Sequence, residues 1–411
     1  MPNKKEKSFL LKIGSNKLKV VYCMSKSRPK ILFIGPTPPP YSGPELSMQQ
    51  FLESKSLNNS FEISFLKTNF RTDNTKKGKF GLSMVTQFFL FFFKLLKHLV
   101  LNRPKCVYYP VTPTQIGWLG RDVWTILLSK LFGAKIIIHL RGSHFKLNFN
   151  EFSAIAKKLI AFALKHVDKA IVQAKYLKDQ FSPFISEEKV AVLYQAMDIN
   201  EFKYDENYPV EKGKILVIGH MTKAKGYTDI LKAIPEVCKV FSEAKFYFAG
   251  NMRKGERGVF YNQVTGEKII YEDPFVEEKR ILDSAFKNNY VNLGIIEGED
   301  KLRHLKSSEI FLTASYSEGF SRSLLEAMAV GKPLAYTPVG AHREVLKDRI
   351  NGHVFDPGNI NEMQNVLTNM LANPDQLKNM GLENREYVVN DFSVEKIVDD
   401  FKNIINSTIP K

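Results

Sequence analysis

The stretch that decides the fold is SEGFSRSLLEAMAVGKP, residues 317–333, which follows the apolar run EIFLTAS of residues 309–315. The apolar run predicts a buried strand, and Ser321 is a suitable N-cap for a helix over residues 321–330. A strand that passes through a short turn into a helix is the repeating unit of a parallel sheet. The peptide therefore predicts an α/β domain in which the turn carries the functional side chains.

The same alternation recurs on both sides of this peptide and predicts two doubly wound, Rossmann-like domains. Strands are expected in the first half at 30–35, 61–66, 106–109, 135–139, 169–172 and 190–193, and in the second half at 215–218, 245–249, 291–293, 310–313, 333–336 and 353–355. A polar, turn-rich segment at 202–213 separates the two series. We divide the chain into a basic segment (1–28), an N-terminal domain (29–205), a C-terminal domain (206–390) and a last helix (391–411), for which packing back on the N-terminal domain is one interpretation.

Composition narrows the class of protein. The 411 residues hold three widely separated cysteines, Cys23, Cys106 and Cys238, which give neither a disulfide framework nor a metal-ligand spacing and favour a reducing cytoplasm. The N-terminus is lysine-rich without the long apolar core of a signal peptide. A net charge of +16 favours an anionic partner, either a membrane surface or a phosphorylated small molecule, over a merely basic surface. No nucleic-acid-binding signature accompanies the charge.

The most apolar stretch, residues 84–101, has two interpretations. Lys94, Lys97 and His98 interrupt it, so it falls short of the roughly 20 uncharged residues that a membrane-spanning helix needs. Aromatic residues beside lysines suit a helix that lies at a membrane interface. Equally, six consecutive apolar residues suit a core helix of the N-terminal domain.

Two carboxylates of the deciding stretch are candidates for ligand binding. Glu326 lies among apolar helical neighbours, where an ionised group is costly unless it is hydrogen-bonded, and ribose hydroxyls would supply two donors. Glu318 lies in the turn before the helix, where it could accept sugar hydroxyls. The helix begins near 322–324, and its amino end favours a phosphate. The simpler alternative is an exposed helical glutamate and a capping turn.

The stretch resembles the donor-binding signature of the retaining family 4 glycosyltransferases, which have the GT-B fold. Two glutamates separated by seven residues, Glu318 and Glu326, stand with Gly319 and with the tail EAMA-x-G-x-P. Phe320 and Ser321 occupy the aromatic and small positions, and TPVGAHREVLKDRINGHVFDPGN (337–359) matches the run that follows in the family. The resemblance implies that Glu318 contacts the donor sugar and Glu326 the ribose. It also implies that the amides of Arg322, Ser323 and Leu324 hold the diphosphate.

A second match is GHMTKAKGYTDILKAI, residues 219–234. In the family a strand ends in Gly-Arg, and a Lys-Gly pair then opens the next helix, so that two cations stabilise the departing diphosphate. Gly219 and Lys225 fit this register, whereas His220 replaces the arginine and is a weaker phosphate ligand. Lys223 or Arg141 would compensate. A solvated lysine at a helix start is the simpler alternative for Lys225.

Two matches fall in the N-terminal half. PTPPPYSGPELSM (36–48) resembles the family's loop beside the donor phosphate and the acceptor; of its usual two glycines only Gly43 is present. KIIIHLRGSHF (135–145) resembles a strand that ends in a histidine facing the donor sugar. The matching position is Arg141 if Gly142 is the anchor, and His139 if strand length is the anchor. For His139 a satisfied core histidine is the alternative.

The resemblance implies a retaining glycosyltransferase with an acceptor-side N-terminal domain and a nucleotide-sugar-binding C-terminal domain facing it across a donor/acceptor cleft. The expected reaction moves a hexose from a nucleotide-diphosphate sugar, with UDP favoured, to a glycan or polyprenyl-diphosphate-linked acceptor in surface polysaccharide or glycoconjugate biosynthesis. We expect no metal or cofactor, no nucleic-acid partner, and a cytoplasmic enzyme in peripheral contact with an anionic membrane. The alternatives are a basic scaffold, a sugar-nucleotide epimerase and a non-catalytic GT-B partner subunit.

Overall fold

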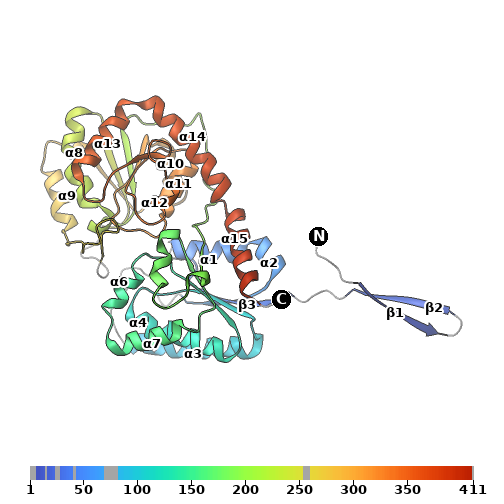
Figure 1. Ribbon diagram of the computed structural model, residues 1–411. Helices are drawn as coiled ribbons and strands as arrows, with labels where there is room; N and C mark the ends of the chain where they lie inside the picture. Colours follow the sequence, from blue (N-terminus) through green and yellow to red (C-terminus); the bar gives the residue numbers. More distant parts are fainter. Residues whose placement is uncertain are drawn as a thin grey trace.

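The computed structural model describes residues 6–13, 16–23, 28–39, 43–68, 82–252 and 260–409. Two strands, β1 (Glu6–Ile13) and β2 (Asn16–Cys23), pair antiparallel near the N-terminus. This pairing falls in the segment 1–28, which was predicted only as basic; residues 1–5, 14–15 and 24–27 of that segment lie outside the described ranges. Two α/β domains follow (Figure 1).

The N-terminal domain is built on a parallel sheet of six strands in the order β4-β3-β5-β6-β7-β8. The strands are β3 (Lys30–Gly35), β4 (Glu62–Lys67), β5 (Cys106–Pro110), β6 (Lys135–His139), β7 (Lys169–Val172) and β8 (Val190–Val192). Its helical segments are α1 (Gly43–Glu53), α2 (Lys55–Ser60), α3 (Leu82–Asn102), α4 (Gln115–Gly117), the π-helical turn η2 (Trp118–Asp122), α5 (Val123–Leu131), α6 (Phe145–Asn150), α7 (Ala154–Leu164), η3 (Lys175–Phe181) and η4 (Glu187–Lys189). Figure 1 places α3, α4 and α7 along the lower side of the sheet and α1 on the upper side.

The C-terminal domain repeats the plan with a parallel sheet in the order β11-β10-β9-β12-β13-β14. Its strands are β9 (Lys214–Ile218), β10 (Lys245–Ala249), β11 (Tyr290–Gly294), β12 (Ile310–Thr313), β13 (Leu334–Tyr336) and β14 (Gly352–Val354). The helical segments are η5 (Lys223–Lys225), α8 (Tyr227–Val240), α9 (Pro274–Leu282), η6 (Lys287–Asn289), α10 (Gly298–Ser307), α11 (Arg322–Ala329), α12 (His342–Val345), α13 (Ile360–Ala372), α14 (Pro374–Asp391) and α15 (Val394–Thr408). The two doubly wound sheets confirm the predicted GT-B fold class.

The strands lie within one or two residues of their predicted bounds, and most of them are apolar runs buried between helix layers. The edge strands β4 and β11 contain polar residues and are only partly buried. The helix predicted over residues 321–330 is α11, which runs from Arg322 to Ala329 with Ser321 as its N-cap. The predicted domain boundary at 205/206 falls between β8 and β9.

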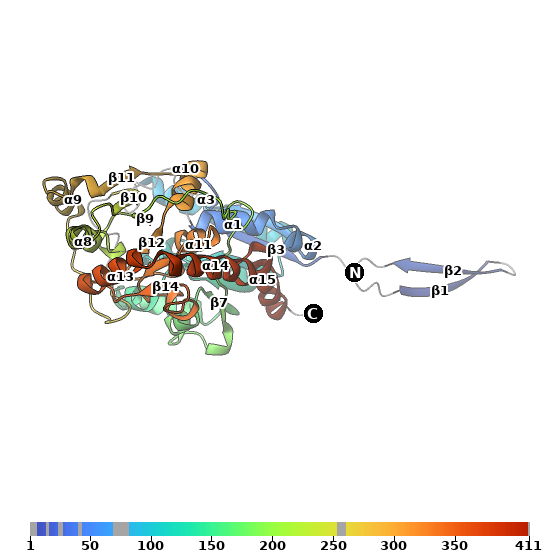
Figure 2. The same cartoon turned by 90° about the horizontal axis from the view of Figure 1, so that it is seen from above.

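The last helix crosses back to the N-terminal domain, as Figure 2 shows for the succession α13, α14, α15. Phe401 of α15 stacks on Phe51 of α1, with ring centroids 4.6 Å apart, and also packs against Tyr108 of β5. Where the chain crosses, the N–H of Met197 donates to the carbonyl of Phe392 (2.7 Å), and the N–H of Val394 donates to the carbonyl of Met197 (3.1 Å). The two segments that join the domains are therefore tied to each other, and we refer to this pairing as the crossover seam.

Helix α3 has one side in the core, as the second interpretation of its sequence predicts, and one side at the surface. Phe91, Leu95 and Leu99 face the sheet and are buried, whereas Phe89 and Phe93 are exposed on the opposite side. Within the described ranges, no helix has the length and apolar character that crossing a bilayer would require.

Candidate active site

The candidate site lies where loops leave the carboxyl ends of the neighbouring strands β9, β12 and β13, as expected for ligand sites in doubly wound sheets. Lys225 ends the 3₁₀ turn η5 after β9, and Gly226 follows it with a φ of 72°. A Cβ on Gly226 would lie 2.2 Å from the carbonyl oxygen of Ala314. The Lys-Gly pair therefore has a steric cause: only glycine lets the loop that carries Lys225 lie against the end of β12.

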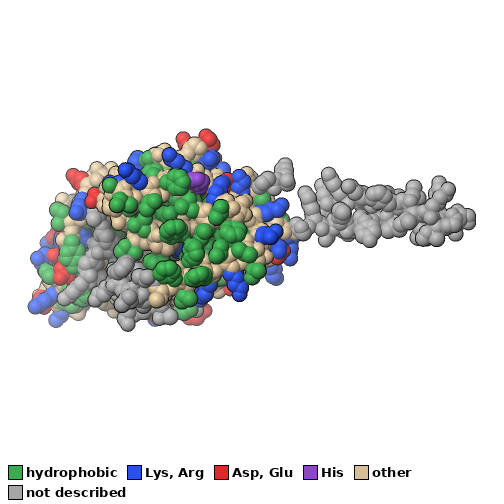
Figure 3. Space-filling view, turned by 90° about the horizontal axis from the view of Figure 1, so that it is seen from below, with side chains coloured by type: hydrophobic (Ala, Val, Ile, Leu, Met, Phe, Trp, Pro, Cys, Tyr) green, Lys and Arg blue, Asp and Glu red, His purple; other side chains and the backbone are tan. Residues whose placement is uncertain are grey.

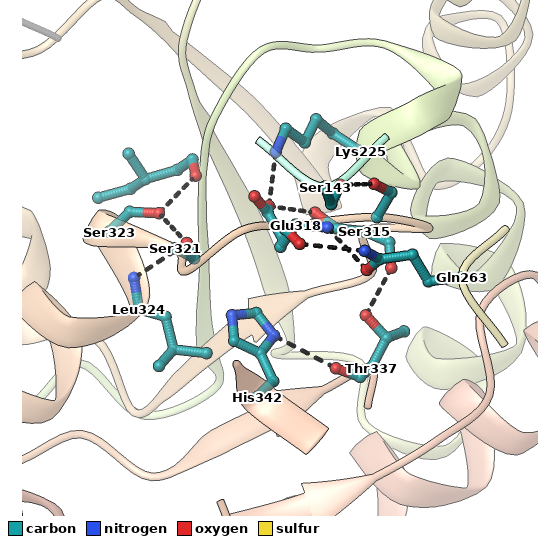
Figure 4. Close-up of polar contacts among 12 residues, drawn as sticks. Ser143, Lys225, Gln263, Ser315, Glu318, Ser321, Ser323, Leu324, Thr337 and His342 are labelled. Carbon is teal, nitrogen blue, oxygen red and sulfur yellow. Dashed lines mark hydrogen bonds and ion pairs between the residues drawn. The ribbon is translucent and has the colours of Figure 1, made fainter. Parts of the chain in front are cut away.

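Lys225 and Glu318 form the central ion pair of the site (Figure 4). The ammonium nitrogen lies 2.5 Å from Oε1 of Glu318, and the hydroxyl of Ser315 donates to the same oxygen at 2.8 Å. Burial raises the pKa of the Glu318 carboxyl, but Lys225, His342 and Ser315 together outweigh burial and hold the pKa below its ordinary value. Glu318 is therefore an ionised acceptor at neutral pH.

The backbone of Glu318 is held by a side chain from the long loop after β10. Gln263 accepts from the N–H of Glu318 (3.1 Å) and donates to its carbonyl (3.2 Å), so its amide closes a ring with the main chain. On the other side, the N–H of Ala341 donates to the carbonyl of Gly319 (2.8 Å). Gly340 permits this approach, since a Cβ there would lie 2.3 Å from the carbonyl oxygen of Glu318.

Ser315 is positioned in turn by the loop after β13. Thr337 donates its hydroxyl to the carbonyl of Ser315 at 2.6 Å, and Nδ1 of His342 lies 3.3 Å from the carbonyl oxygen of Thr337. Burial lowers the pKa of His342, so its imidazole is neutral and Nδ1–H donates. The turn at Glu318 is therefore fixed by three loops before any ligand binds.

Helix α11 begins next to this turn. The hydroxyl of Ser321 accepts from the N–H of Leu324 at 3.4 Å, which is the N-cap that the sequence predicts. Ser323 donates its hydroxyl to the carbonyl of Ile218 at the end of β9 (3.1 Å), directly before Gly219. Figure 4 shows the amino end of α11 beside the Lys225–Glu318 pair, and the bond from Ser323 to Ile218 ties the end of β9 to the same helix start.

Glu326 is buried, with 1% of its surface exposed, and two cations face it. Nε of Arg322 donates to Oε1 at 3.2 Å, and Nζ of Lys301 lies 2.5 Å from Oε2. The Lys301 contact pairs the charges but lacks hydrogen-bond geometry, so Oε2 accepts no hydrogen bond from the part of the chain that the structure describes. Glu326 is therefore a buried carboxylate whose charge is balanced by Arg322 and Lys301.

The N-terminal domain reaches the site through the loop after β6. The hydroxyl of Ser317 lies 2.7 Å from the hydroxyl of Ser143 and 2.5 Å from Nε2 of His144. Burial lowers the pKa of His144 to about 4, so this contact is made by a neutral imidazole. A Cβ on Gly319 would lie 2.9 Å from the carbonyl oxygen of Arg141. The glycine after Glu318 is thus required by the contact between the domains.

The two candidates for the residue that faces the donor sugar, His139 and Arg141, differ in their burial. His139 is fully buried and its Nδ1 lies 2.9 Å from the hydroxyl of Tyr108; burial lowers its pKa far below the ordinary value. This burial favours the alternative of a core histidine, and the contact of His139 with the donor sugar stays a prediction. Arg141 is half-buried beyond the strand, and its guanidinium donates to Gln195 (3.3 Å) and to Tyr108 (3.4 Å).

Three more of the predicted donor-binding residues, Gly43, His220 and Phe320, lie in different surroundings. Gly43 opens α1, and a Cβ added to it would meet no atom within 4 Å; residues 40–42 of the same loop lie outside the described ranges. His220 is exposed in the turn after β9. Phe320 packs its ring against Phe392 and Tyr194, so only its main chain is left for a donor.

Lys223 does not compensate for His220. Its ammonium group lies 2.5 Å from Asp229 and 3.2 Å from Glu272, inside the C-terminal domain, and its side chain is about one-tenth exposed. Arg141 is likewise engaged within the N-terminal domain. Among the residues that the structure describes, Lys225 is thus the cation that pairs with Glu318.

The residues of the site that were not predicted from the sequence include Gln263, Lys301 and His144. Gln263 and Lys301 belong to segments without a residue pattern, and they meet Glu318 and Glu326 only through the fold. His144 stands three residues after Arg141 in the peptide already singled out, so its position was available as a signal. Among the described residues, no group of three or more His, Cys, Asp or Glu side chains is arranged to hold a metal ion.

Comparison with known proteins indicates the class of enzyme. The sequence model of the family described as "Glycosyl transferases group 1" matches residues 198–387. An uncharacterized glycosyltransferase of Methanocaldococcus jannaschii is 22% identical over 317 residues, or 73% of this chain and 76% of that protein. One subunit of the phosphatidylinositol N-acetylglucosaminyltransferase of Arabidopsis thaliana is 26% identical over 52% of this chain, which spans just under half (46%) of the relative's length.

Among solved structures, HepE from Anabaena in complex with UDP superposes with a TM-score of 0.69 at 15% identity, over 92% of this chain and all of that chain. The fold and the site thus define a glycosyltransferase of the GT-B fold. Residues 198–387, the part that matches the model of the group 1 glycosyl transferases, carry Glu318, Glu326 and Lys225.

Proposed function

We propose that this enzyme is a retaining glycosyltransferase that moves a hexose from a UDP-sugar to a hydroxyl of a glycan or lipid-linked acceptor. The observation that carries the proposal is the Lys225–Glu318 pair, fixed by three loops at the strand ends of the C-terminal domain. A cation and an ionised acceptor side by side suit a ligand that presents an anionic diphosphate next to sugar hydroxyls.

The donor would be held by positive groups at its diphosphate and by carboxylates at its hydroxyl groups. Lys225 and the amino end of α11 face the diphosphate, because a helix start offers free N–H groups and a positive dipole end. Glu318 accepts hydrogen bonds from the sugar hydroxyls, and Glu326 accepts one from the ribose in place of its contact with Lys301. HepE is described in complexes with UDP and with UDP-glucose, which supports a uridine donor here.

In the reaction the bond between the anomeric carbon and the diphosphate oxygen breaks, and the acceptor oxygen attacks from the same face. The leaving diphosphate oxygen takes up the acceptor's proton, so the step needs no protein nucleophile. Lys225 and the amino end of α11 stabilise the charge that develops on the diphosphate. We propose that these groups replace a metal ion, so that turnover continues in the presence of a chelator.

The acceptor is proposed to be a polyprenyl-diphosphate-linked or related glycan at the inner face of a membrane. Support comes from the net charge of +16 and from the exposed aromatic side chains of α3. The name of the Arabidopsis relative refers to a lipid, phosphatidylinositol, which is consistent with an acceptor of this kind.

A thermal-shift screen over UDP-, GDP- and ADP-sugars tests the donor site, with Glu326→Ala beside the wild type. We expect one nucleotide class to stabilise the wild type and to lose its effect in the variant. An absence of any shift would overturn the proposal.

The anomeric configuration of the product tests retention: an inverted product would refute the mechanism. Free epimerised sugar without acceptor would indicate an epimerase, and donor binding without turnover would indicate a non-catalytic partner.

A further inference from the structure

One face of the N-terminal domain is apolar and is not covered by any element that the structure describes. Helix α3 packs against α5, and α5 packs against α7, so the three lie side by side on the lower side of the sheet. Their outward sides carry large apolar residues, which Figure 3 shows gathered on this face: Phe89, Leu90, Phe93, Val100, Leu101, Trp124, Leu131, Ile155, Leu159 and Phe162. We call this set of side chains the apolar face.

These side chains are highly exposed on all three helices. Phe89 and Phe93 of α3 are each 62% exposed, Leu131 at the end of α5 is 78% exposed, and Ile155 of α7 is 74% exposed. Each helix also has an apolar inner side, such as Leu95 and Leu99 in α3. The sequence therefore provides two apolar sides per helix where the core uses one, and a contiguous exposed patch of this kind marks an interaction surface.

The charges on the three helices all have one sign. Residues 82–102, 123–131 and 154–164 contain no Asp or Glu, and they carry Lys94, Lys97, Lys130, Lys157 and Lys158. Lys94, Lys97 and Lys158 are exposed between the apolar residues. A lysine in this position can extend its ammonium group away from the apolar surface that its methylenes cover.

We propose that the apolar face docks on an anionic lipid bilayer, with α3, α5 and α7 lying in the plane of the interface. The apolar side chains would enter the boundary between headgroups and acyl chains, and the lysines would reach the anionic headgroups. A second copy of the chain fits less well, because a symmetric contact through this face would set the lysines of one copy against those of the other.

The face reaches the edge of the domain where the substrate is expected. α4 follows the carboxyl end of β5, and the N–H of Ser153, before α7, donates to Oε1 of Gln115 in α4 at 2.8 Å. Ile116 of α4 and Ile155 of α7 are both exposed there. A lipid-linked acceptor held in the bilayer would thus have its head at the strand ends of the N-terminal domain. This last step rests on the proposed function, whereas the docking itself does not.

Flotation with vesicles tests the docking, using phosphatidylcholine alone and phosphatidylcholine mixed with phosphatidylglycerol. We expect the wild type to bind the mixed vesicles and to be released by salt. The variant Phe89→Ser/Phe93→Ser/Leu131→Ser and the variant Lys94→Glu/Lys97→Glu/Lys158→Glu should each bind at least about tenfold more weakly. The matched control is Val276→Ser/Leu282→Ser, which changes exposed apolar residues of α9 in the other domain and should bind normally.

Stabilisation by the donor nucleotide, measured on each variant, shows whether it is folded and keeps the donor site separate from the docking. Wild type that fails to bind mixed vesicles would overturn the docking proposal even if the donor binds. Folded variants that bind as tightly as the wild type would also overturn it. So would a wild-type dimer that the serine variant turns into a monomer, because the face would then be a contact between two copies.

Discussion

The two sides of the candidate site are built from different kinds of groups. On the C-terminal side, charges meet in pairs: Lys225 with Glu318, and Lys301 with Glu326. On the N-terminal side, neutral amides and hydroxyls surround one cation. Arg141 donates to Gln195, which also accepts from Gln173 (3.3 Å) and donates to Ser47 (2.8 Å).

This difference indicates a division of labour. Paired charges suit a diphosphate and a ribose, which every nucleotide-sugar donor has in common, whereas a neutral network suits hydroxyl groups that vary among acceptors. Changes on the C-terminal side should therefore affect the donor and the chemical step. Changes on the N-terminal side should affect stability or acceptor use.

The largest effect is expected for Lys225→Met. Loss of the cation beside the leaving diphosphate should lower kcat/KM about 100- to 1000-fold in a transfer assay. Lys232→Met is the matched control. Lys232 lies on α8, away from Glu318, and its Nζ pairs with Oε2 of Glu272 at 2.7 Å. A Lys225→Met enzyme within a few-fold of the wild type would show that the charge pair has no role in the chemical step.

Glu326→Gln is expected to raise the donor KM about 10- to 100-fold with a smaller change in kcat, because a charged acceptor for the ribose is lost. It should also lower the free energy of unfolding by about 1–3 kcal/mol, because Arg322 and Lys301 lose their counter-charge. Adding Lys301→Met should restore part of the stability without restoring the KM. If both recover together, Glu326 serves only to balance its neighbours.

Gln263→Ala is expected to lower kcat about tenfold, because the Glu318 turn loses two hydrogen bonds that hold its main chain. Gln263→Glu keeps the acceptor for the Glu318 N–H and loses the donor, so its kcat should be intermediate. Equal kcat values for all three proteins would mean that the remaining loops hold the turn alone.

The lowered pKa of His144 predicts that the folded protein loses stability at acid pH. In the folded protein its pKa is about 4, below the ordinary 6.5, so the unfolded chain takes up a proton first as the pH falls. The stability that this neutral histidine provides is therefore complete above about pH 6.5 and is lost toward pH 4, by about 2–3 kcal/mol. Tm measured against pH should fall less steeply for His144→Gln between pH 6.5 and 5. The contribution of Glu318 is lost only below its ordinary pKa of 4.5.

The smallest effect is expected for His139→Phe. The variant removes one hydrogen bond to Tyr108 within the core, so it should cost about 1 kcal/mol in the free energy of unfolding. Its kcat should stay within about twofold of the wild type. A large loss of kcat with an unchanged Tm would return His139 to the site and remove the contrast between the two domains.

Much of the C-terminal side could be predicted from the sequence because its residues stand in short peptides with a fixed spacing. Glu318 and Glu326 are separated by a loop turn and little more than one helical turn, and Lys225 is fixed by the glycine that follows it. The strands were predictable for a related reason, since burial on both faces leaves a continuous apolar run.

The residues that were missed meet their partners only through the fold. Gln263 reaches Glu318 across 55 residues and His144 reaches Ser317 across 173, and neither local pattern indicates the contact. The choice between His139 and Arg141 depended on where the strand ends and which side chain is buried, and spacing alone does not determine burial. The hydrophobic stretch of α3 was ambiguous for the opposite reason, because it serves both the core and the surface.

The crossover seam between Met197, Phe392 and Val394 has a practical consequence. Because α15 packs on the N-terminal domain, a fluorophore attached after Thr408 would report the position of that domain, although the preceding 18-residue helix α14 belongs to the other one. A second fluorophore on α9 of the C-terminal domain would complete a distance pair. Energy transfer between the two would then follow the angle between the domains while donor, acceptor or vesicles are added.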